Sequence, residues 1–211
     1  MIQKLRIILA VFISLLPINI VRIFFYRFFL GYKIKQSRIG YLTVIAVDSF
    51  TANIARIGKF CLFIGPMTVE ICNGASIGNR NEFFCGYWTK KTYNNTLKYG
   101  KHVYIGQNAL ITTRHYFDVA GRVFIGENTW IAGIGSQFWS HGAGVIERDI
   151  MIGARCYIGS GVRFAPGSSI GNGVLVGIGA VINKIIAGDN IVIVGAESRI
   201  VKTNYMWKDR S

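Results

Sequence analysis

Histidine is the side chain in this sequence best suited to acid–base chemistry at neutral pH. The chain has three histidines, His102, His115 and His141, and the last two each stand where a regular segment gives way to an irregular one. An imidazole with a pKa of about 6.5 can take the proton of a hydroxyl group, which is otherwise too weak a nucleophile at neutral pH. We therefore treat His115 and His141 as candidate general bases.

The cysteines do not suggest a second chemistry. They contain no C-x-x-C pair, so their spacing predicts neither a zinc site nor a small disulfide framework. We expect them to be reduced, buried thiols that only pack. The four are Cys61, Cys72, Cys85 and Cys156.

The elements that must position the histidines follow an unusual period. The dipeptide Ile-Gly recurs from about Lys35 onward, which indicates a repeat fold. Its isoleucines are at positions 39, 57, 64, 77, 105, 125, 134, 152, 158, 170 and 178. In the most regular stretch the large apolar residues are six positions apart, and six is neither a helical nor a strand period. These residues are Ile152, Ile158, Phe164, Ile170, Val176 and Ile182.

A six-residue period predicts a coil with three sides. A large apolar residue that points inward every sixth position, with a small residue beside it, lets the chain turn a corner at each hexad. Gly40 and Gly58 are 18 residues apart, as are Gly153 and Gly171, and 18 is three hexads. Successive coils should therefore stack in register and bury their apolar residues against one another. We expect this all-β domain over 34–203, between an apolar N-terminal segment (1–33) and a short tail (204–211).

Three loop excursions are expected to interrupt the coils, near 86–101, 115–122 and 142–150. Loops on a rigid scaffold often carry functional sites. The first is rich in aromatic residues and lysines, including Tyr87 and Trp88, which suits stacking on a sugar ring or holding an anion. If the coils stack as proposed, residues 110–115 and 136–141 share a face, and His115 and His141 are expected to lie close together.

These hexads and the segment around His141 resemble the hexapeptide-repeat acyltransferases, above all bacterial sugar O-acetyltransferases. The specific part of the resemblance runs from about Gln137 to Lys184. It comprises Trp139-Ser140-His141-Gly142, a short loop, Tyr157-Ile158-Gly159-Ser160, Pro166-Gly167 and Gly177-Ile178-Gly179-Ala180-Val181. The resemblance implies a left-handed parallel β-helix, whereas parallel crossovers are usually right-handed. It further implies a homotrimer with sites between subunits, acetyl-CoA as acyl donor, and His141 as the general base.

The resemblance also implies roles for other residues, and His115 remains the rival base. His115 and Asp118 are expected to hold the acceptor, together with Trp139, Tyr87 and Trp88. Ser160, Ile178 and Gly179 are expected to line the groove for the donor, although relatives often have a small residue at the position of Ile178. The basic residues that could meet its phosphates are Arg163, Lys184, Arg199 and Lys202. No metal is expected.

Charge and apolar patterning point to an anionic partner. The chain has 24 Lys and Arg against 10 Asp and Glu, a net charge of +14. The uncharged N-terminal stretch is 15 residues long, contains Pro17, and is shorter than the roughly 20 residues that span a bilayer. A helix that caps the coil and a segment that binds an anionic membrane surface both remain open. A signal peptide is a third alternative, although no clear cleavage site follows. We expect a cytoplasmic protein, peripheral on the inner membrane.

The expected function is transfer of acetyl to a hydroxyl of a sugar in a bacterial surface polysaccharide or its precursor. The alternatives are a non-catalytic β-helix scaffold and an acyltransferase with a non-sugar acceptor. The γ-class carbonic anhydrases share the fold, but they need two histidine ligands five residues apart, whereas these histidines are separated by 13 and 26 residues. A nucleic-acid binder would explain only the charge, so we expect no nucleic acid. Serine acetyltransferases and nucleotidyltransferases have further domains, for which no signal is found.

Overall fold

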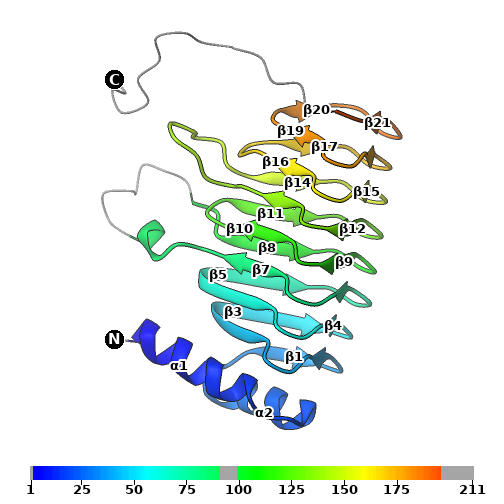
Figure 1. The fold of residues 1–211 in the computed structure, drawn as a ribbon. Coiled ribbons are helices and arrows are strands. Elements are labelled where there is room, and N and C mark those ends of the chain that lie inside the picture. Colours follow the sequence, from blue (N-terminus) through cyan, green and yellow to red (C-terminus); the bar gives the residue numbers. More distant parts are fainter. Residues whose placement is uncertain (1, 91–98, 196–211) are drawn as a thin grey trace.

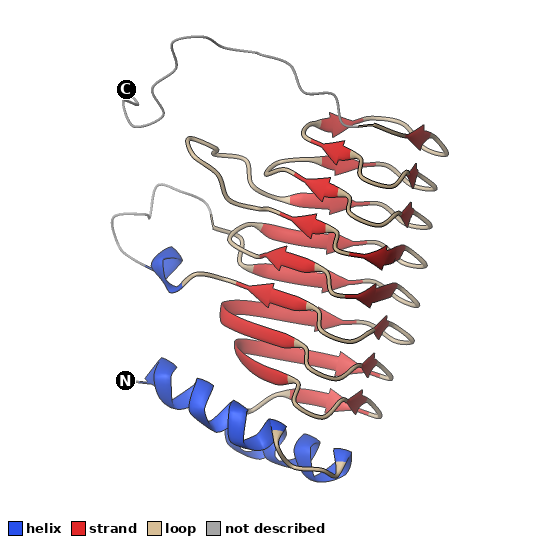
Figure 2. Cartoon of the chain, in the orientation of Figure 1, coloured by secondary structure: helices blue, strands red, loops and turns tan. Residues whose placement is uncertain are grey.

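The structure is a computed structural model that describes residues 2–90 and 99–195. Two helices, α1 (Ile2–Ser14) and α2 (Asn19–Leu30), precede the strands, and one short 3-10 helix, η1 (Tyr87–Lys90), interrupts them. The strands form a single stack of coils that rises from the helices, and all paired strands are parallel (Figures 1 and 2). Seen from the C-terminal end, the chain runs clockwise as it rises, so the coil is left-handed (Figure 1). The expected parallel β-helix is confirmed.

The coil has three faces. Face 1 is an eight-stranded sheet of β2 (Arg38–Ile39), β4 (Arg56–Ile57), β6 (Ser76–Ile77), β9 (Leu110–Thr113), β12 (Trp130–Ile134), β15 (Tyr157–Ile158), β18 (Leu175–Val176) and β21 (Val192–Ile193). Face 2 contains β7 (Glu82–Phe84), β10 (Tyr116–Asp118), β13 (Gln137–Phe138), β16 (Arg163–Phe164) and β19 (Val181–Ile182). Face 3 contains β1 (Lys33–Lys35), β8 (His102–Ile105), β11 (Arg122–Ile125), β14 (Ile150–Ile152), β17 (Ser169–Ile170) and β20 (Ile185–Ile186).

Two long strands join faces 2 and 3. The first part of β5 (Leu62–Ile71) pairs with β7 and its last part with β8. The neighbouring β3 (Val44–Asn53) pairs along most of β5, with a register shift between Val47 and Ser49. The first coils are therefore continuous around this corner, while later coils leave it through loops (Figure 2).

The pairing register confirms the 18-residue coil where the repeat is cleanest. Ile39 is opposite Ile57, and Ile152 is opposite Ile170. The glycine of the Ile-Gly pair is required because the backbones approach closely at the corner. A Cβ at Gly153 would lie 2.3 Å from the carbonyl oxygen of Gly171 in the next coil, so a larger residue could not be placed there without moving the backbone.

Apolar residues fill the inside of the coil as the hexads predict. The six predicted inward residues from Ile152 to Ile182 are all at most 5% exposed. Behind face 2, phenyl rings from successive strands stack with centroids 4.4–5.1 Å apart. The ladder consists of Phe63, Phe83, Phe117, Phe138 and Phe164. Such pairs add about 0.5–1.5 kcal/mol each beyond area burial, so this face is a rigid support.

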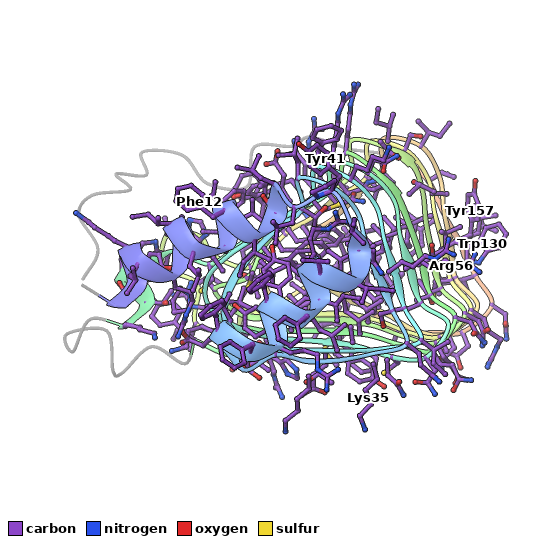
Figure 3. All side chains as sticks on the ribbon, turned by 90° about the horizontal axis from the view of Figure 1, so that it is seen from below. Phe12, Lys35, Tyr41, Arg56, Trp130 and Tyr157 are labelled. Atoms are coloured by element: carbon purple, nitrogen blue, oxygen red, sulfur yellow. The ribbon has the colours of Figure 1, made fainter. Side chains whose placement is uncertain are left out.

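The two helices lie across the open N-terminal end of the coil (Figure 3). Tyr26 of α2 is fully buried, and its hydroxyl donates to the Thr43 carbonyl (2.8 Å). The buried guanidinium of Arg22 donates to the Ile39 carbonyl (2.6 Å) and to the Leu16 carbonyl. The bonds to Thr43 and Ile39 satisfy carbonyl groups of the first coil, and the bond to Leu16 ties the coil to the segment between the helices. Neither helix of the described chain is long and apolar enough to cross a membrane.

The excursion expected near 115–122 is not a loop. Residues 116–118 form β10, which pairs on both sides, and only a tight turn at Val119–Gly121 separates it from β11. The strand lacks an Ile-Gly pair because Phe117 takes the inward position, so the repeat signal missed it. The excursion near 142–150 is present, since residues 139–149 leave the coil between β13 and β14. Only the ends of the one near 86–101 lie within the described residues.

The cysteines pack as expected. All four are free, and Cys61, Cys85 and Cys156 are buried. Burial raises the pKa of the Cys61 and Cys85 thiols to about 11, so both are protonated at neutral pH. They therefore act as small apolar side chains.

Candidate active site

Two neighbouring coils bring Asp118 and His141 together on face 2. Phe117 of β10 is opposite Phe138 of β13, so Asp118 and Trp139 follow at the ends of paired strands. The chain then leaves the coil after Trp139, and His141 folds back so that its Nδ1 contacts Asp118 Oδ2. The phenyl ladder directly behind these strands fixes the positions from which both side chains start.

The carboxylate of Asp118 is held in place. Its side chain is only 5% exposed, and its Oδ1 accepts the Ala120 N–H (3.1 Å) and the Ser140 hydroxyl (3.4 Å). Ser140 is itself oriented, because its oxygen accepts the Gly121 N–H (2.9 Å). An ionised carboxylate can only accept hydrogen bonds, so the proton of a neutral His141 ring must lie on Nδ1. Nε2 is then left as the basic nitrogen.

His141 faces a cavity lined by aromatic and small residues. Its side chain is 44% exposed, its ring lies edge-on to Trp88 (centroids 5.5 Å apart), and Trp139 lies 6.4 Å away. The cavity is about 370 Å³, within the range of about 300–1,000 Å³ that small-molecule sites occupy. Its walls are Trp88, Tyr99, His141, Gly142, Gly144, Val145, Ile146 and Arg148. An imidazole whose Nδ1 is bonded to a carboxylate thus borders a space of small-molecule size.

His115 does not lie beside His141, contrary to the expectation of a shared pocket. The register places it opposite Ser136, at the start of the paired strands rather than at their end. The ring is buried, its Nδ1 accepts the Ser136 N–H (3.1 Å), and its Nε2 is 2.9 Å from the Thr112 hydroxyl. Burial lowers the pKa of His115 to about 4. Nδ1 links His115 to the neighbouring coil and Nε2 bonds within its own coil, and His115 does not line the cavity.

The other predicted acceptor residues are divided between two places. Trp88 and Trp139 contact His141, whereas Tyr87 is not among the residues that line the cavity. The Tyr87 hydroxyl is buried without a hydrogen-bond partner among the described residues, and burial raises its pKa. His102 is also remote, because it lies on face 3 opposite Thr68, with Nε2 3.4 Å from Glu70 Oε1.

The predicted donor-binding residues lie apart from the cavity in the single chain. The Ser160 hydroxyl accepts the Ile134 N–H (3.2 Å), and its carbonyl accepts the Gly179 N–H (2.9 Å). Ile178 is 81% exposed at the same corner. Arg163 on β16 and Lys184 before β20 are exposed. Arg199 and Lys202 lie outside the described residues.

Sequence reasoning did not single out Tyr99 and Arg148, which also line the cavity. The guanidinium carbon of Arg148 lies 4.9 Å from the Tyr99 ring centroid. Neither belongs to a hexad or to the quoted motifs, so the sequence offered no signal for them beyond their place in loops. Within the described chain, no three His, Cys, Asp or Glu side chains group in a way that could hold a metal ion.

Two solved structures are similar to this chain. One is the polySia-specific acetyltransferase NeuO, with 17% sequence identity, a TM-score of 0.47, and coverage of 83% of each chain. The other is the hexapeptide-repeat-containing acetyltransferase VCA0836 from Vibrio cholerae, with 17% identity and a TM-score of 0.47, covering 95% of this chain and 89% of that one. No family model matches the sequence. Similarity at this level does not assign an activity.

Proposed function

We propose that the protein is an O-acetyltransferase that moves acetyl from acetyl-CoA to a hydroxyl of a sugar, with His141 as the general base. The observation that carries this is the buried Asp118 carboxylate bonded to Nδ1 of His141, whose ring borders a cavity of small-molecule size. A β-helix that served only as a scaffold would have no need of an oriented carboxylate–histidine pair.

The proposed acyl transfer begins and ends with a proton transfer at His141. Nε2 of His141 takes the hydroxyl proton as the acceptor oxygen forms a bond to the acetyl carbonyl carbon. Asp118 stabilises the resulting imidazolium through Nδ1 without taking the proton itself. When the carbon–sulfur bond breaks, the imidazolium returns its proton to the leaving thiolate, so the products are the acetyl ester and the free thiol of coenzyme A.

Aromatic side chains around the base suit a sugar acceptor. Trp88 and Trp139 both contact the His141 ring, and Tyr116 extends the surface from Trp139 (centroids 4.8 Å apart). Flat apolar rings pack against the C–H faces of a pyranose while leaving its hydroxyls to polar groups. We infer that the acceptor belongs to a bacterial surface polysaccharide or its precursor.

A homotrimer would complete the donor site. In the single chain no predicted donor-binding residue lines the His141 cavity, so the donor must approach along a surface that another subunit can close. Face 1 offers an unpartnered apolar column in register, formed by Trp130, Tyr157, Leu175 and Val192, which are 43–68% exposed (Figure 3 labels the first two). Light scattering should give the mass of three chains, and a monomer mass would exclude this assembly.

The helical cap suits contact with an anionic membrane surface. Its outer side exposes large apolar residues, among them Phe12, Ile20, Phe24 and Phe28 at 56–77%. Exposed cations surround them at Lys4, Arg27, Lys33 and Lys35, and no acidic residue precedes Asp48 in the chain. Asp48 lies near α1, but its carboxylate is paired with Arg6 and Lys90. Apolar side chains flanked by cations match an anionic lipid headgroup layer. We therefore propose that the protein is peripheral on the cytoplasmic surface of the inner membrane.

An acceptor panel tests the proposed reaction. Purified protein is supplied with acetyl-CoA and with free, phosphorylated and lipid-linked sugars, and both coenzyme A release and the acetylated product are measured. Product ester on a sugar hydroxyl supports the proposal. Ester formed only on non-sugar hydroxyls would show that the acceptor is not a sugar. Absence of acetyl-CoA binding would exclude acetyl transfer and favour the non-catalytic scaffold.

A further inference from the structure

Among the residues that the structure describes, the buried guanidinium of Arg148 has no counter-ion. Arg148 is 6% exposed, and its Nε is buried without a hydrogen-bond partner. Within the described residues its guanidinium makes no ion pair or hydrogen bond, and its one charge-related contact is the Tyr99 ring. Burying a cation costs free energy unless an anion or strong acceptors compensate it. The guanidinium of Arg148 therefore lacks the anionic or hydrogen-bonding partner that a bound ligand could supply.

Nearby carboxylates do not fill this role. Asp149 already forms an ion pair with Arg122, whose Nε (2.7 Å) and terminal guanidinium nitrogen (2.6 Å) contact its carboxylate. Asp118 is bonded to His141. Glu147 is exposed and forms no ion pair with a described residue. Each acid around the cavity is thus paired elsewhere or in solvent.

Arg148 is also fixed in position. Gly121 packs so closely against it that a Cβ there would lie 2.7–2.8 Å from the Arg148 carbonyl group and Cβ. The same turn carries Ala120, whose N–H binds Asp118, and Gly121, whose N–H binds Ser140. One turn therefore helps to set both the orientation of His141, through Asp118 and Ser140, and the position from which the Arg148 side chain starts, and the Tyr99 ring holds its guanidinium. A binding group held in this way needs little reorganisation when a ligand arrives.

We propose that Arg148 binds an oxyanion, carboxylate or phosphate, on the acceptor, so that the enzyme selects acidic sugars. This rests on the proposed acetyl transfer, because Arg148 and His141 line the same cavity of about 370 Å³. A guanidinium presents parallel N–H donors that can form bidentate hydrogen bonds with a carboxylate or a phosphate. The anion anchors one side of the sugar ring, and the hydroxyl that faces His141 is the one acetylated.

Binding without acetyl-CoA isolates this site from turnover. Calorimetry compares glucuronate, glucose 1-phosphate and glucose on wild type, Arg148→Met and a matched control, Arg80→Met. Arg80 also lies over an aromatic ring (Phe60, 5.6 Å), but it is exposed and outside the cavity. We expect wild type and the control to bind one acidic sugar about 10- to 100-fold more tightly than glucose, and Arg148→Met to lose that preference. Whichever acid binds identifies the anion.

Equal affinity of wild type for all three sugars would overturn the proposal. Loss of neutral and acidic binding together in Arg148→Met would also overturn it, since that indicates a structural role. So would a loss confined to acetyl-CoA affinity, which would assign Arg148 to the donor phosphates. If Arg148→Met does not fold, Arg148→Lys provides the second test. It keeps the positive charge but loses the parallel donors of the guanidinium, so it should retain a weakened preference for the acidic sugar. Arg148-dependent binding without acetyl transfer would refute the reaction and leave this site standing.

Discussion

At the level of single residues, the proposed catalysis depends on how Asp118 orients the imidazole of His141. The residues are 23 positions apart and meet because β10 and β13 end side by side. The carboxylate is almost fully buried while the imidazole stays accessible, so the pair combines a fixed orienting group with a nitrogen open to the cavity. Asp118 is thus a positioning residue for His141 and does not itself line the cavity.

Asp118→Asn should lower kcat by about 10²- to 10⁴-fold, because an amide can hold the wrong imidazole tautomer and does not stabilise the imidazolium. Affinity for acetyl-CoA should be unchanged. The matched control is Asp189→Asn, an exposed carboxylate bonded to Asn172 far along the stack. Steady-state kinetics with both substrates varied makes the comparison. A kcat close to that of wild type would remove Asp118 from the mechanism.

The sequence identified the two residues of this pair but not their relationship. Asp118 was expected to hold the acceptor, since nothing in the sequence shows that residues 116–118 form a strand paired with 137–138. His115 was placed in the same pocket because a count of hexads cannot fix which end of a strand a residue occupies. Arg148 gave no signal, because the energetic cost of its isolation exists only once the chain has folded around it.

His115 should make stability depend on pH. Burial lowers the folded-state pKa to about 4, below the unfolded value of about 6.5, so the unfolded chain binds the extra proton between those values. Stability from the neutral ring is therefore complete above pH 6.5 and falls by about 3 kcal/mol as the pH drops toward 4.

Urea unfolding of wild type and His115→Gln at several pH values tests this. The variant should lose the part of the pH dependence between 4 and 6.5, whereas His102→Gln, altered on face 3, should keep it. Identical pH profiles for His115→Gln and wild type would show that the ring is not held neutral.

At the scale of elements, the phenyl ladder is the support for the site. Phe117 stacks between Phe83 and Phe138 with centroids 4.4 Å from each, directly beneath Asp118 and Trp139. The hexads predicted most of this architecture, because an inward apolar residue and a small corner residue recur with every side of the coil. Their interruption predicted that the chain leaves the coil near 142–150, but not the conformation of the segment 139–149, because that segment has no period.

Phe117→Ala should destabilise the fold by about 3–5 kcal/mol, since it removes a fully buried ring from between two others. Phe124→Ala is the matched control, because Phe124 stacks on Tyr104 (4.8 Å) on the outer side of face 3, half-buried. Phe124→Ala should lower the free energy of unfolding by a clearly smaller amount. Denaturant midpoints of the two variants make the comparison. Equal losses of stability would contradict the view that the inner phenyl ladder stabilises the fold more than the outer ring pair.

At the scale of the whole molecule, the cap and the site lie at different heights of one rigid stack (Figure 1). The helices close the N-terminal end, and His141 contacts Asp118 at the end of β10, a strand that lies above the helices (Figure 1). If the cap rests on a membrane, the cavity is held at a fixed height above the lipid. An acceptor attached to a lipid would then be presented at a defined distance from the base.

Vesicle co-sedimentation tests the cap. Wild type should bind phosphatidylcholine vesicles that contain phosphatidylglycerol, and bind less at high salt because its cations are screened. Phe24→Asp with Phe28→Asp should abolish binding and leave thermal stability unchanged, since both rings are exposed. Phe60→Asp, an exposed ring on a coil corner, is the control. Binding that survives the double substitution would place membrane contact elsewhere or exclude it.

Catalysis by His141 is tested by acetyl transfer in His141→Ala compared with wild type and His102→Ala, each with acetyl-CoA binding measured in parallel. We expect transfer to fall by about 10²- to 10⁴-fold in His141→Ala while the donor still binds, and His102→Ala to behave as wild type. Transfer at the wild-type rate without His141 would exclude it as the general base, because no other histidine within the described chain lines the cavity.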